Sequence, residues 1–347
     1  MGPSRLQKAA QFHPDDLSIR LKEIVIPQPE EDEILVQTIA AGLCHSDLML
    51  VDGSAPVLPN HVVTIGHEAV GRVIDFGREV TGFAKGDEIG FLNAHRACWK
   101  CPSCAIHYLW CESGRMQMQG YSLNGFLQEY SVVDYRAACK LPEGMEASKA
   151  APLCCAGITA YHGVQKAQLQ SGQWLVVIGC GGLGQIGVRY AKAMGYKVIA
   201  IDIDDAVLSK AKEAGVENTV NSRTESDVAK KIKEITGKGA DAVVVFTAVK
   251  AGYDIAPKTL KTGGRLIVVG CPPTEISFNA LDISLGKYTV HGASNHATPA
   301  MLRECVEFTH QHGIESPSQF FKIEDIGEMI SIMQSGKMGG KRLVVKF

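Results

Sequence analysis

The second half of the chain alternates short apolar runs with amphipathic segments, and this pattern constrains the fold more than any other feature. It predicts strands at residues 174–178, 197–202, 241–246 and 265–269, and helices at residues 183–194 and 205–214. Such an alternation forms a parallel, doubly wound α/β sheet, because each crossover helix packs back onto the sheet in a right-handed sense. The remaining tail predicts a last strand at 288–291, a helix at 299–311 and a β segment at 342–347.

A glycine-rich loop directly follows the first of these strands and opens the first helix. It reads Gly179-Cys180-Gly181-Gly182-Leu183-Gly184. In the dinucleotide fingerprint the first glycine permits a tight turn, the second lets a pyrophosphate approach the backbone, and the third lets helix and strand pack closely. The free N–H groups of the helix N-terminus then face the phosphates. Glycines alone indicate only a tight turn, but strand, loop, helix and a distal acid together predict a bound dinucleotide.

The distal acid is Asp202, eighteen residues beyond Gly184 at the end of the second strand. A carboxylate there can accept both hydroxyls of the adenosine ribose, and it repels the extra phosphate of NADP. The next residues are Ile203, Asp204 and Asp205, so no neighbouring Arg or Lys offsets this repulsion. The sequence therefore predicts NAD(H) as the cofactor, and it assigns the capping of the following helix to Asp204.

The first half of the chain contains short β-type runs separated by turns. The clearest of them lie at residues 33–39, 69–76, 88–91 and 130–133. A chain of 347 residues exceeds the usual size of a single core, so two domains are expected. We therefore expect an irregular, β-rich domain ahead of the α/β domain.

Four cysteines stand within fourteen residues of the β-rich half, in the pattern Cys-x2-Cys-x2-Cys-x6-Cys. They are Cys98, Cys101, Cys104 and Cys111. Four thiolates at such spacings can surround one tetrahedral Zn²⁺, and the turn-like residues between them let the sulfurs converge. A closed shell of four thiolates leaves no position for a substrate, so this zinc is predicted to be structural. Four unrelated buried cysteines and a disulfide framework are the weaker alternatives.

Composition argues against several classes of partner. The formal net charge is −2 and no basic run is present, which disfavours a nucleic-acid partner. No stretch approaches the eighteen apolar residues of a membrane-spanning helix, so no membrane association is expected. Eleven cysteines without an export signal favour reduced thiols and metal ligands in a cytoplasmic protein.

Three further motifs occur along the chain. They are Cys44-His45-Ser46-Asp47, then Gly66-His67-Glu68-Ala69-Val70-Gly71 followed by Gly77 and Val80, and finally Cys155-Ala156-Gly157-Ile158-Thr159. Together with the glycine loop and the four-cysteine ladder at residues 98–111, these motifs resemble the zinc-dependent alcohol dehydrogenases of the medium-chain dehydrogenase/reductase superfamily. The resemblance extends over nearly the whole chain. The resemblance implies a GroES-like catalytic domain at 1–156 with a zinc lobe at about 95–113, a Rossmann NAD-binding domain at 157–291, and a C-terminal segment at 292–347 that returns to the catalytic domain.

The resemblance also implies a second, catalytic zinc bound by Cys44, His67 and Cys155. Cys154 is a rival on sequence alone, but Cys155 directly precedes the segment 156–159, as the family's ligand does. Three protein ligands leave a fourth position open, which a catalytic zinc requires. Zinc in such a site polarises the substrate oxygen while a hydride passes between the substrate and the nicotinamide.

Other site residues follow from the same resemblance. Ser46 would carry the first proton, Asp47 would accept from the free ring N–H of His67, and Glu68 would stand beside the metal as a transient ligand. Ordinary surface or capping carboxylates are the alternative for the two acids. The implied cofactor contacts are His45, Thr159, Gly179, Gly181, Gly182, Leu183, Gly184, Asp202, Val269, Lys341 and Arg342.

The sequence departs from the family pattern around the substrate. Met49 stands where many members have a histidine that completes a proton relay, so slower alcohol oxidation near neutral pH is expected. Ser54 and Ala55 stand near a position that often holds a bulky tryptophan, which predicts a wider pocket, with Phe91 as an aromatic wall. His95 is assigned to the loop before the cysteine ladder and not to a metal.

The sequence therefore predicts an NAD-dependent zinc alcohol dehydrogenase with two zinc ions per chain and a small alcohol or aldehyde as substrate. A polyol or secondary-alcohol dehydrogenase of the same superfamily is the nearest alternative. A zinc- or nucleotide-binding protein without turnover is the alternative from another class. The resemblance further implies a homo-dimer or homo-tetramer.

Overall fold

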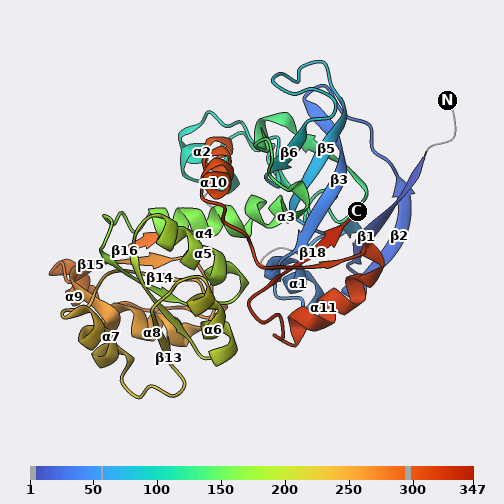
Figure 1. Ribbon diagram of the computed structural model, residues 1–347. Coiled ribbons are helices and arrows are strands. Elements are labelled where there is room, and N and C mark those ends of the chain that lie inside the picture. Colours follow the sequence, from blue (N-terminus) through green and yellow to red (C-terminus); the bar gives the residue numbers. More distant parts are fainter. Residues whose placement is uncertain (1–4, 56–57, 294–297) are drawn as a thin grey trace.

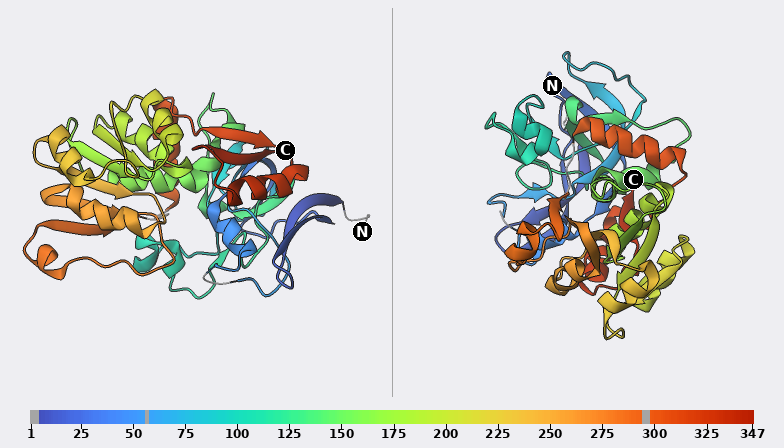
Figure 2. Two further views of the ribbon diagram at one scale, coloured as in Figure 1. Left: turned by 90° about the horizontal axis from the view of Figure 1, so that it is seen from below. Right: turned by 90° about the vertical axis from the view of Figure 1, so that its left-hand side faces the viewer.

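A parallel α/β part and a mainly antiparallel β part lie side by side in the computed structural model, which describes residues 5–55, 58–293 and 298–347 (Figures 1 and 2). Both ends of the described chain lie in the β part, since the first strand and the last strand belong to its sheets. The predicted combination of a β-rich domain with a doubly wound α/β domain is confirmed.

The α/β part is built on a six-stranded parallel sheet with the strand order β13-β12-β11-β14-β15-β16. Its strands are β11 (Trp174–Ile178), β12 (Lys197–Asp202), β13 (Asn218–Asn221), β14 (Ala240–Val245), β15 (Leu260–Val268) and β16 (Tyr288–Gly292). The helices of this part are α4 (Ala156–Gln165), α5 (Gly182–Ala193), α6 (Asp205–Glu213), α7 (Val228–Thr236), α8 (Lys250–Thr259) and α9 (Ala280–Ser284). The chain moves outward from β11 in one direction and then restarts from β14 in the other, which creates a crevice for ligands at the carboxyl ends of these two strands.

Most of the predicted elements of this part are confirmed, and the differences have a physical reason. The predicted strand at 241–246 begins and ends one residue earlier as β14, and the strand predicted at 265–269 begins at Leu260. A register shift between Ala240 and Ala242 lets β15 pair earlier than its apolar run suggests. The edge strand β13 was not predicted, because only Val220 of its four residues is buried and three are polar.

The β part contains a seven-stranded sheet with the order β10-β6-β5-β3-β18-β17, in which β9 also pairs with β3. Its strands are β3 (Glu33–Leu43), β5 (Glu68–Phe76), β6 (Glu88–Phe91), β9 (Tyr130–Asp134), β10 (Ala138–Lys140), β17 (Ser318–Phe321) and β18 (Arg342–Lys346). Two smaller sheets are formed by β1 (Leu6–His13), β2 (Ser18–Val25) and β4 (Val63–Thr64), and by β7 (Ala94–His95) and β8 (Gln117–Met118). The antiparallel partners allow one face to be solvated, which is why the runs in this half are less continuously apolar.

Short helices link these strands. They are α1 (His45–Val51), α2 (Pro102–Ile106), η1 (Tyr108–Trp110), η2 (Tyr135–Ala137), α3 (Ala147–Ala150) and η3 (Ala151–Cys154), followed near the C-terminus by α10 (Pro299–Gln311), η4 (Ile323–Asp325) and α11 (Ile326–Gln334). The C-terminal strand β18 lies between β3 and β17, antiparallel to the first and parallel to the second (Figure 1). The chain therefore leaves the parallel sheet and re-enters the β part before it ends.

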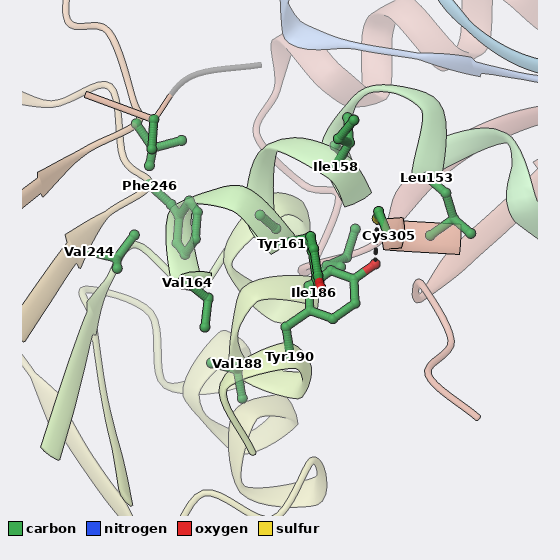
Figure 3. Close-up of a cluster of buried hydrophobic side chains, with 14 of the residues drawn as sticks. Leu153, Ile158, Tyr161, Val164, Ile186, Val188, Tyr190, Val244, Phe246 and Cys305 are labelled. Atoms are coloured by element: carbon green, nitrogen blue, oxygen red, sulfur yellow. Dashed lines mark hydrogen bonds between the residues drawn. The ribbon is translucent and has the colours of Figure 1, made fainter. Parts of the chain in front are cut away.

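One buried cluster joins the two parts. It combines Val70 and Leu92 of the β part with Val177 and Val244 of the parallel sheet. In the same region, the rings of Tyr161 in α4, Tyr190 in α5 and Phe308 in α10 pack against one another. Figure 3 shows the two tyrosines next to Cys305 of α10. The Tyr190 hydroxyl lies 2.6 Å from the Thr309 Oγ1 and 3.3 Å from the Cys305 Sγ, so α5 and α10 are also joined by polar contacts inside the core.

We expect Gly187→Ala to destabilise the α/β part. A methyl group at Gly187 of α5 would lie 2.5 Å from the buried ring of Phe246. Overpacking should lower the free energy of unfolding by about 1–3 kcal/mol, which outweighs the roughly 1 kcal/mol gained in helix propensity. Gly327→Ala in α11 is the control, since a methyl group there meets nothing within 4 Å. Denaturant unfolding checks both variants, and equal stabilities would contradict this account.

Candidate metal centre and dinucleotide site

Three predicted metal ligands converge at the end of β3. Cys44 follows β3, His67 precedes β5, and Cys155 lies between η3 and α4; their ligand atoms all lie within 4.8 Å of one another. The first two meet because β3 and β5 run antiparallel with Gly42 opposite Glu68. The rival Cys154 faces elsewhere: a methyl group on Gly90 would lie 3.0 Å from its Sγ. The geometry thus brings together the three residues that the resemblance selected.

The chemistry of these three side chains fits a divalent cation. The contact between the two thiols lowers the pKa of Cys44 and raises the pKa of Cys155, because both cannot ionise side by side without a positive charge. His67 is 5% exposed, so its ring is also largely removed from water. Two thiolates and an imidazole at this separation could hold one zinc ion and would leave one tetrahedral position to another ligand.

Asp47 is fully buried in the first turn of α1 and accepts three hydrogen bonds. Its Oδ1 lies 3.1 Å from the Nδ1 of His67 and 3.1 Å from the Gly66 N–H, and its Oδ2 accepts from the Cys44 N–H at 2.8 Å. The Asp47 carboxylate therefore touches the backbone or the ring of two of the three convergent residues. Such a contact fixes the orientation and the basicity of a ligating imidazole.

Glu68 and Arg342 form a buried ion pair beside the three ligands. The Arg342 Nη2 lies 2.5 Å from the Glu68 Oε1, and a methyl group at Gly42 would lie 2.0 Å from that oxygen. Burial raises the pKa of Glu68 to about 7 although the Arg342 charge favours the ionised carboxylate. Arg342 also reaches the glycine loop, because a methyl group on Gly182 would lie 3.1 Å from its Cδ. One side chain thus extends from the dinucleotide loop to the residue that follows His67.

The four cysteines of the ladder also converge. The ligand atoms of Cys98, Cys101, Cys104 and Cys111 lie within 4.8 Å of one another, around α2 and η1. Burial disfavours the thiolate of Cys111, but the Cys98 N–H and the Ser113 hydroxyl overcome it and lower its pKa to about 6. Burial and the neighbouring thiols raise the pKa of Cys104 to about 12. Four thiolates can therefore coexist here only around a cation, which fits a closed zinc site.

His95 is not among the four convergent side chains, as predicted, but it belongs to strand β7 and not to a loop. Its Nε2 lies 2.7 Å from the Glu33 Oε1, and both residues are buried. The expectation for Phe91 was wrong: its ring is fully buried in the core and meets Phe126 edge-on at 4.8 Å, so it forms no wall of an open site.

The glycine loop has the shape that the fingerprint predicts. Gly179 has a φ of +86°, which favours glycine, and a methyl group at Gly184 would lie 2.0 Å from the Gly179 carbonyl oxygen. Gly181 caps α5, and a methyl group there would meet nothing within 4 Å. The backbone at Gly181 is therefore open to a ligand, at the N-terminus of a twelve-residue helix.

Asp202 lies at the carboxyl end of β12, next to this loop. Its Oδ2 accepts from the Cys180 N–H at 2.7 Å, and its Oδ1 accepts from the Ile203 N–H at 2.7 Å. It lines a cavity of about 400 Å³, together with Gly179, Ser222, Glu225, Asp227, Thr247 and others. Asp204, and not Asp202, caps α6 by accepting from the Ala206 N–H, as predicted.

The remaining predicted residues surround these two sites. Ser46 is half-buried and His45 exposed in the first turn of α1, and Met49 is half-buried one turn later. The Thr159 N–H donates to the Cys155 carbonyl at 3.0 Å. The Val269 N–H donates to the Val245 carbonyl at 3.2 Å, and Leu183 stands in the first turn of α5. The Lys341 carbonyl oxygen would lie 3.2 Å from a methyl group on Gly182.

The loop predicted to widen the pocket is only partly described. Ser54 is exposed, and its N–H donates to the Asp52 Oδ1 at 2.9 Å. Ala55 is half-buried against the core, and Pro56 lies outside the described residues.

Tyr121 belongs to the metal centre but was not predicted. Its ring centroid lies 5.7 Å from that of His67, and its hydroxyl lies near the Ser46 side chain. Burial and the nearby Asp47 carboxylate raise the pKa of Tyr121, so the phenol keeps its proton. The only signal in the sequence is the pair Gly120 and Gly125, which indicates a tight loop without revealing what the loop contacts.

Comparison with known proteins agrees with this geometry. Residues 30–143 match the model of the alcohol dehydrogenase GroES-like domain, and residues 182–311 match that of the zinc-binding dehydrogenases. An alcohol dehydrogenase of Moraxella sp. (strain TAE123) is 35% identical over 98% of this chain and 99% of its own length. The alcohol dehydrogenase of Aeropyrum pernix has a TM-score of 0.88 at 29% identity, covering 98% of this chain and all of its own.

A second similar structure contains NAD. Acetophenone reductase from Geotrichum candidum, solved in complex with NAD, has a TM-score of 0.86 at 26% identity, covering 100% of this chain and 98% of its own. The two family models together cover more than half of the chain, and the curated relative covers 98% of it. The chain belongs to the zinc-binding alcohol dehydrogenases of the medium-chain dehydrogenase/reductase superfamily.

Proposed function

We propose that this protein oxidises alcohols and reduces aldehydes or ketones, with NAD(H) as the hydride carrier and a zinc ion held by Cys44, His67 and Cys155. The observation that carries the proposal is the convergence of the three ligand atoms within 4.8 Å, linked to the glycine loop through Arg342. The names of the relatives support the reaction class, since the Moraxella protein is an alcohol dehydrogenase and the Geotrichum protein is an acetophenone reductase in complex with NAD.

The residues around the open metal position have different roles in the proposed reaction. When bound, the zinc supplies a Lewis acid for the substrate oxygen, and the nicotinamide accepts or donates the hydride. Asp47 orients the His67 ring through its Nδ1. Ser46 holds the proton of the substrate oxygen, and the buried Tyr121 phenol lies beside Ser46.

Two zinc ions per chain are part of the proposal. The four-cysteine lobe holds the second one, in a closed thiolate shell that leaves no position to a substrate. Such a lobe is too small for a core of its own, so binding of the metal contributes to its folding. We also infer a cytoplasmic protein, because six of the eleven cysteines lie in the two metal-ligand clusters and none is joined in a disulfide.

We assign NAD(H), rather than NADP(H), from the charges around the cavity at Asp202. Two further carboxylates, Glu225 and Asp227, line the same cavity, against a single Lys258. A ribose 2′-phosphate would therefore be surrounded by negative charge.

We propose a catalytic domain at residues 1–156, a cofactor domain at 157–291 and a returning C-terminal segment at 292–347.

None of the helices in the described ranges combines the length and the apolarity that crossing a membrane requires.

The function is tested by NADH oxidation with short, branched, aromatic and secondary carbonyls, and with NADPH as the control cofactor. We expect turnover with at least one carbonyl and a kcat/KM for NADH at least about tenfold above that for NADPH, or ~1.4 kcal/mol. Asp202→Ser should narrow this preference, and Asp205→Ser on the exposed start of α6 should not. Failure with every carbonyl would favour a binding protein without turnover, and a preference for NADPH would refute the role of Asp202.

The role of Asp47 is tested by metal content. The wild-type protein should hold two zinc ions per chain. Asp47→Asn removes a charged acceptor from His67 and should weaken the catalytic zinc by about 10–100-fold, so a chelator should leave one ion per chain. Asp52→Asn at the exposed end of α1 is the matched control. Equal zinc retention in the two variants would contradict the assigned role.

We also propose that the protein is a homo-dimer or homo-tetramer that associates along β16, the edge strand of the parallel sheet. Leu281 and Leu285, in and just after α9 beside this edge, are 64% and 75% exposed. Sedimentation velocity should show a dimer or tetramer, and Leu285→Glu should shift it toward the monomer because a charge would be buried. Val25→Glu on the exposed β2 is the control, and a monomeric wild-type protein would contradict the proposal.

A further inference from the structure

We propose that the four-cysteine lobe positions the metal centre through a buried chain of hydrogen bonds, Tyr108 to Asn93 to Gln119. This proposal rests on the proposed function of the site at Cys44, His67 and Cys155. It gives the lobe a second role besides its own stability. Tyr108 and Asn93 are then positioning residues, which act on the reaction through the loop at residues 119–125.

The chain begins inside the lobe. The Cys111 N–H donates to the Tyr108 carbonyl at 3.0 Å, so a metal ligand and Tyr108 share one turn, η1. The Tyr108 side chain is 1% exposed, and its ring lies 4.7 Å from the His107 ring and 6.1 Å from the Trp99 ring. Closure of the lobe around its ligands therefore fixes where the Tyr108 hydroxyl points.

The Tyr108 hydroxyl contacts the hairpin into which the lobe is inserted. The lobe is inserted between β7 and β8, which pair antiparallel with Ala94 opposite Met118. The Tyr108 hydroxyl donates to the Asn93 Oδ1 at 2.7 Å, and the Asn93 Nδ2 donates to the Gln119 carbonyl at 3.2 Å. The Gln119 N–H donates to the Asn93 carbonyl at 2.9 Å. Asn93 and Gln119 are 4% and 2% exposed, so water does not replace these bonds.

Gln119 opens a loop that is packed against the residue before His67. The Phe126 N–H donates to the Gly66 carbonyl at 2.9 Å. Methyl groups at Gly120 and Gly125 would lie 2.8 and 2.1 Å from the same carbonyl oxygen, so only glycines permit this approach. The loop therefore has no free space in which to shift without moving the backbone that carries the ligand.

The loop presents Tyr121 to the metal centre. The Tyr121 ring lies 5.7 Å from the His67 ring at 39° between the planes, and its hydroxyl lies near the Ser46 side chain. A shift of the loop would change the contact of Tyr121 with a ligand ring and the surroundings of the Ser46 hydroxyl. Misplacement of such groups by a fraction of the reacting distance costs rate without the loss of any ligand.

The test compares two tyrosines that each lose one buried hydroxyl. Tyr108→Phe breaks the proposed chain, and Tyr190→Phe, in the fully buried contact with Thr309, is the matched control. In the zinc-loaded protein, amide hydrogen exchange at residues 119–125 should become about tenfold faster in Tyr108→Phe, because the buried Asn93 Oδ1 loses the Tyr108 donor. Exchange there should be unchanged in Tyr190→Phe. Asn93→Ala should reproduce the effect if Tyr108→Phe does not fold.

Kinetics then decide whether the loop acts through Tyr121. We expect kcat/KM to fall about tenfold in Tyr108→Phe, while both zinc ions are retained. In a protein that already carries Tyr121→Leu, adding Tyr108→Phe should lower kcat/KM by a smaller factor. Unchanged exchange at 119–125, an equal change in Tyr190→Phe, or additive losses in the double variant would each overturn the proposal. The exchange measurement needs no turnover, so it remains decisive even if the proposed reaction is refuted.

Discussion

The antiparallel pairing of β3 with β5 is the contact on which the rest of the site depends. It sets Gly42 opposite Glu68 and thereby brings Cys44, which follows one strand, beside His67, which precedes the other. Gly42 has no side chain, and the Glu68 carboxylate occupies the space that a methyl group would need. A shift of one residue in this register would turn the side chains of β5 to the opposite face and separate the two ligands.

The other side of β3 is equally constrained. β18 pairs with it antiparallel and carries Arg342 to the buried Glu68. Removal of either partner of a buried ion pair leaves an uncompensated charge in a low dielectric, which costs far more than a surface pair contributes. Because the same arginine contacts Gly182, the C-terminal strand connects the dinucleotide loop with the metal centre. The site is therefore assembled by three segments that are distant in sequence, around one strand.

The parts of the fold and of the site that depend on residues close together in the sequence could be predicted from the sequence. The glycine loop follows β11 directly, and the turn at Gly179 and the close approach at Gly184 need glycine for reasons that a single motif contains. The four-cysteine ladder closes within fourteen residues, so its convergence also follows from spacing. By contrast, β13 is polar and the early start of β15 depends on a register shift, so neither has a clear hydrophobic pattern. Phe91 was misjudged because its burial depends on Phe126 across the core.

By itself, the sequence determined the doubly wound domain, the dinucleotide loop with Asp202, and the closed thiolate lobe, because periodicity and short-range spacing specify them. The choice of Cys155 over Cys154 came from resemblance, and only the tertiary structure turned one sulfur toward Cys44 and the other toward Gly90. Only the fold brought Tyr121 to His67 and joined Tyr108 to Gln119 through Asn93. These contacts join separate segments, and whether two such segments meet is decided by strand register and core packing, which no local pattern encodes.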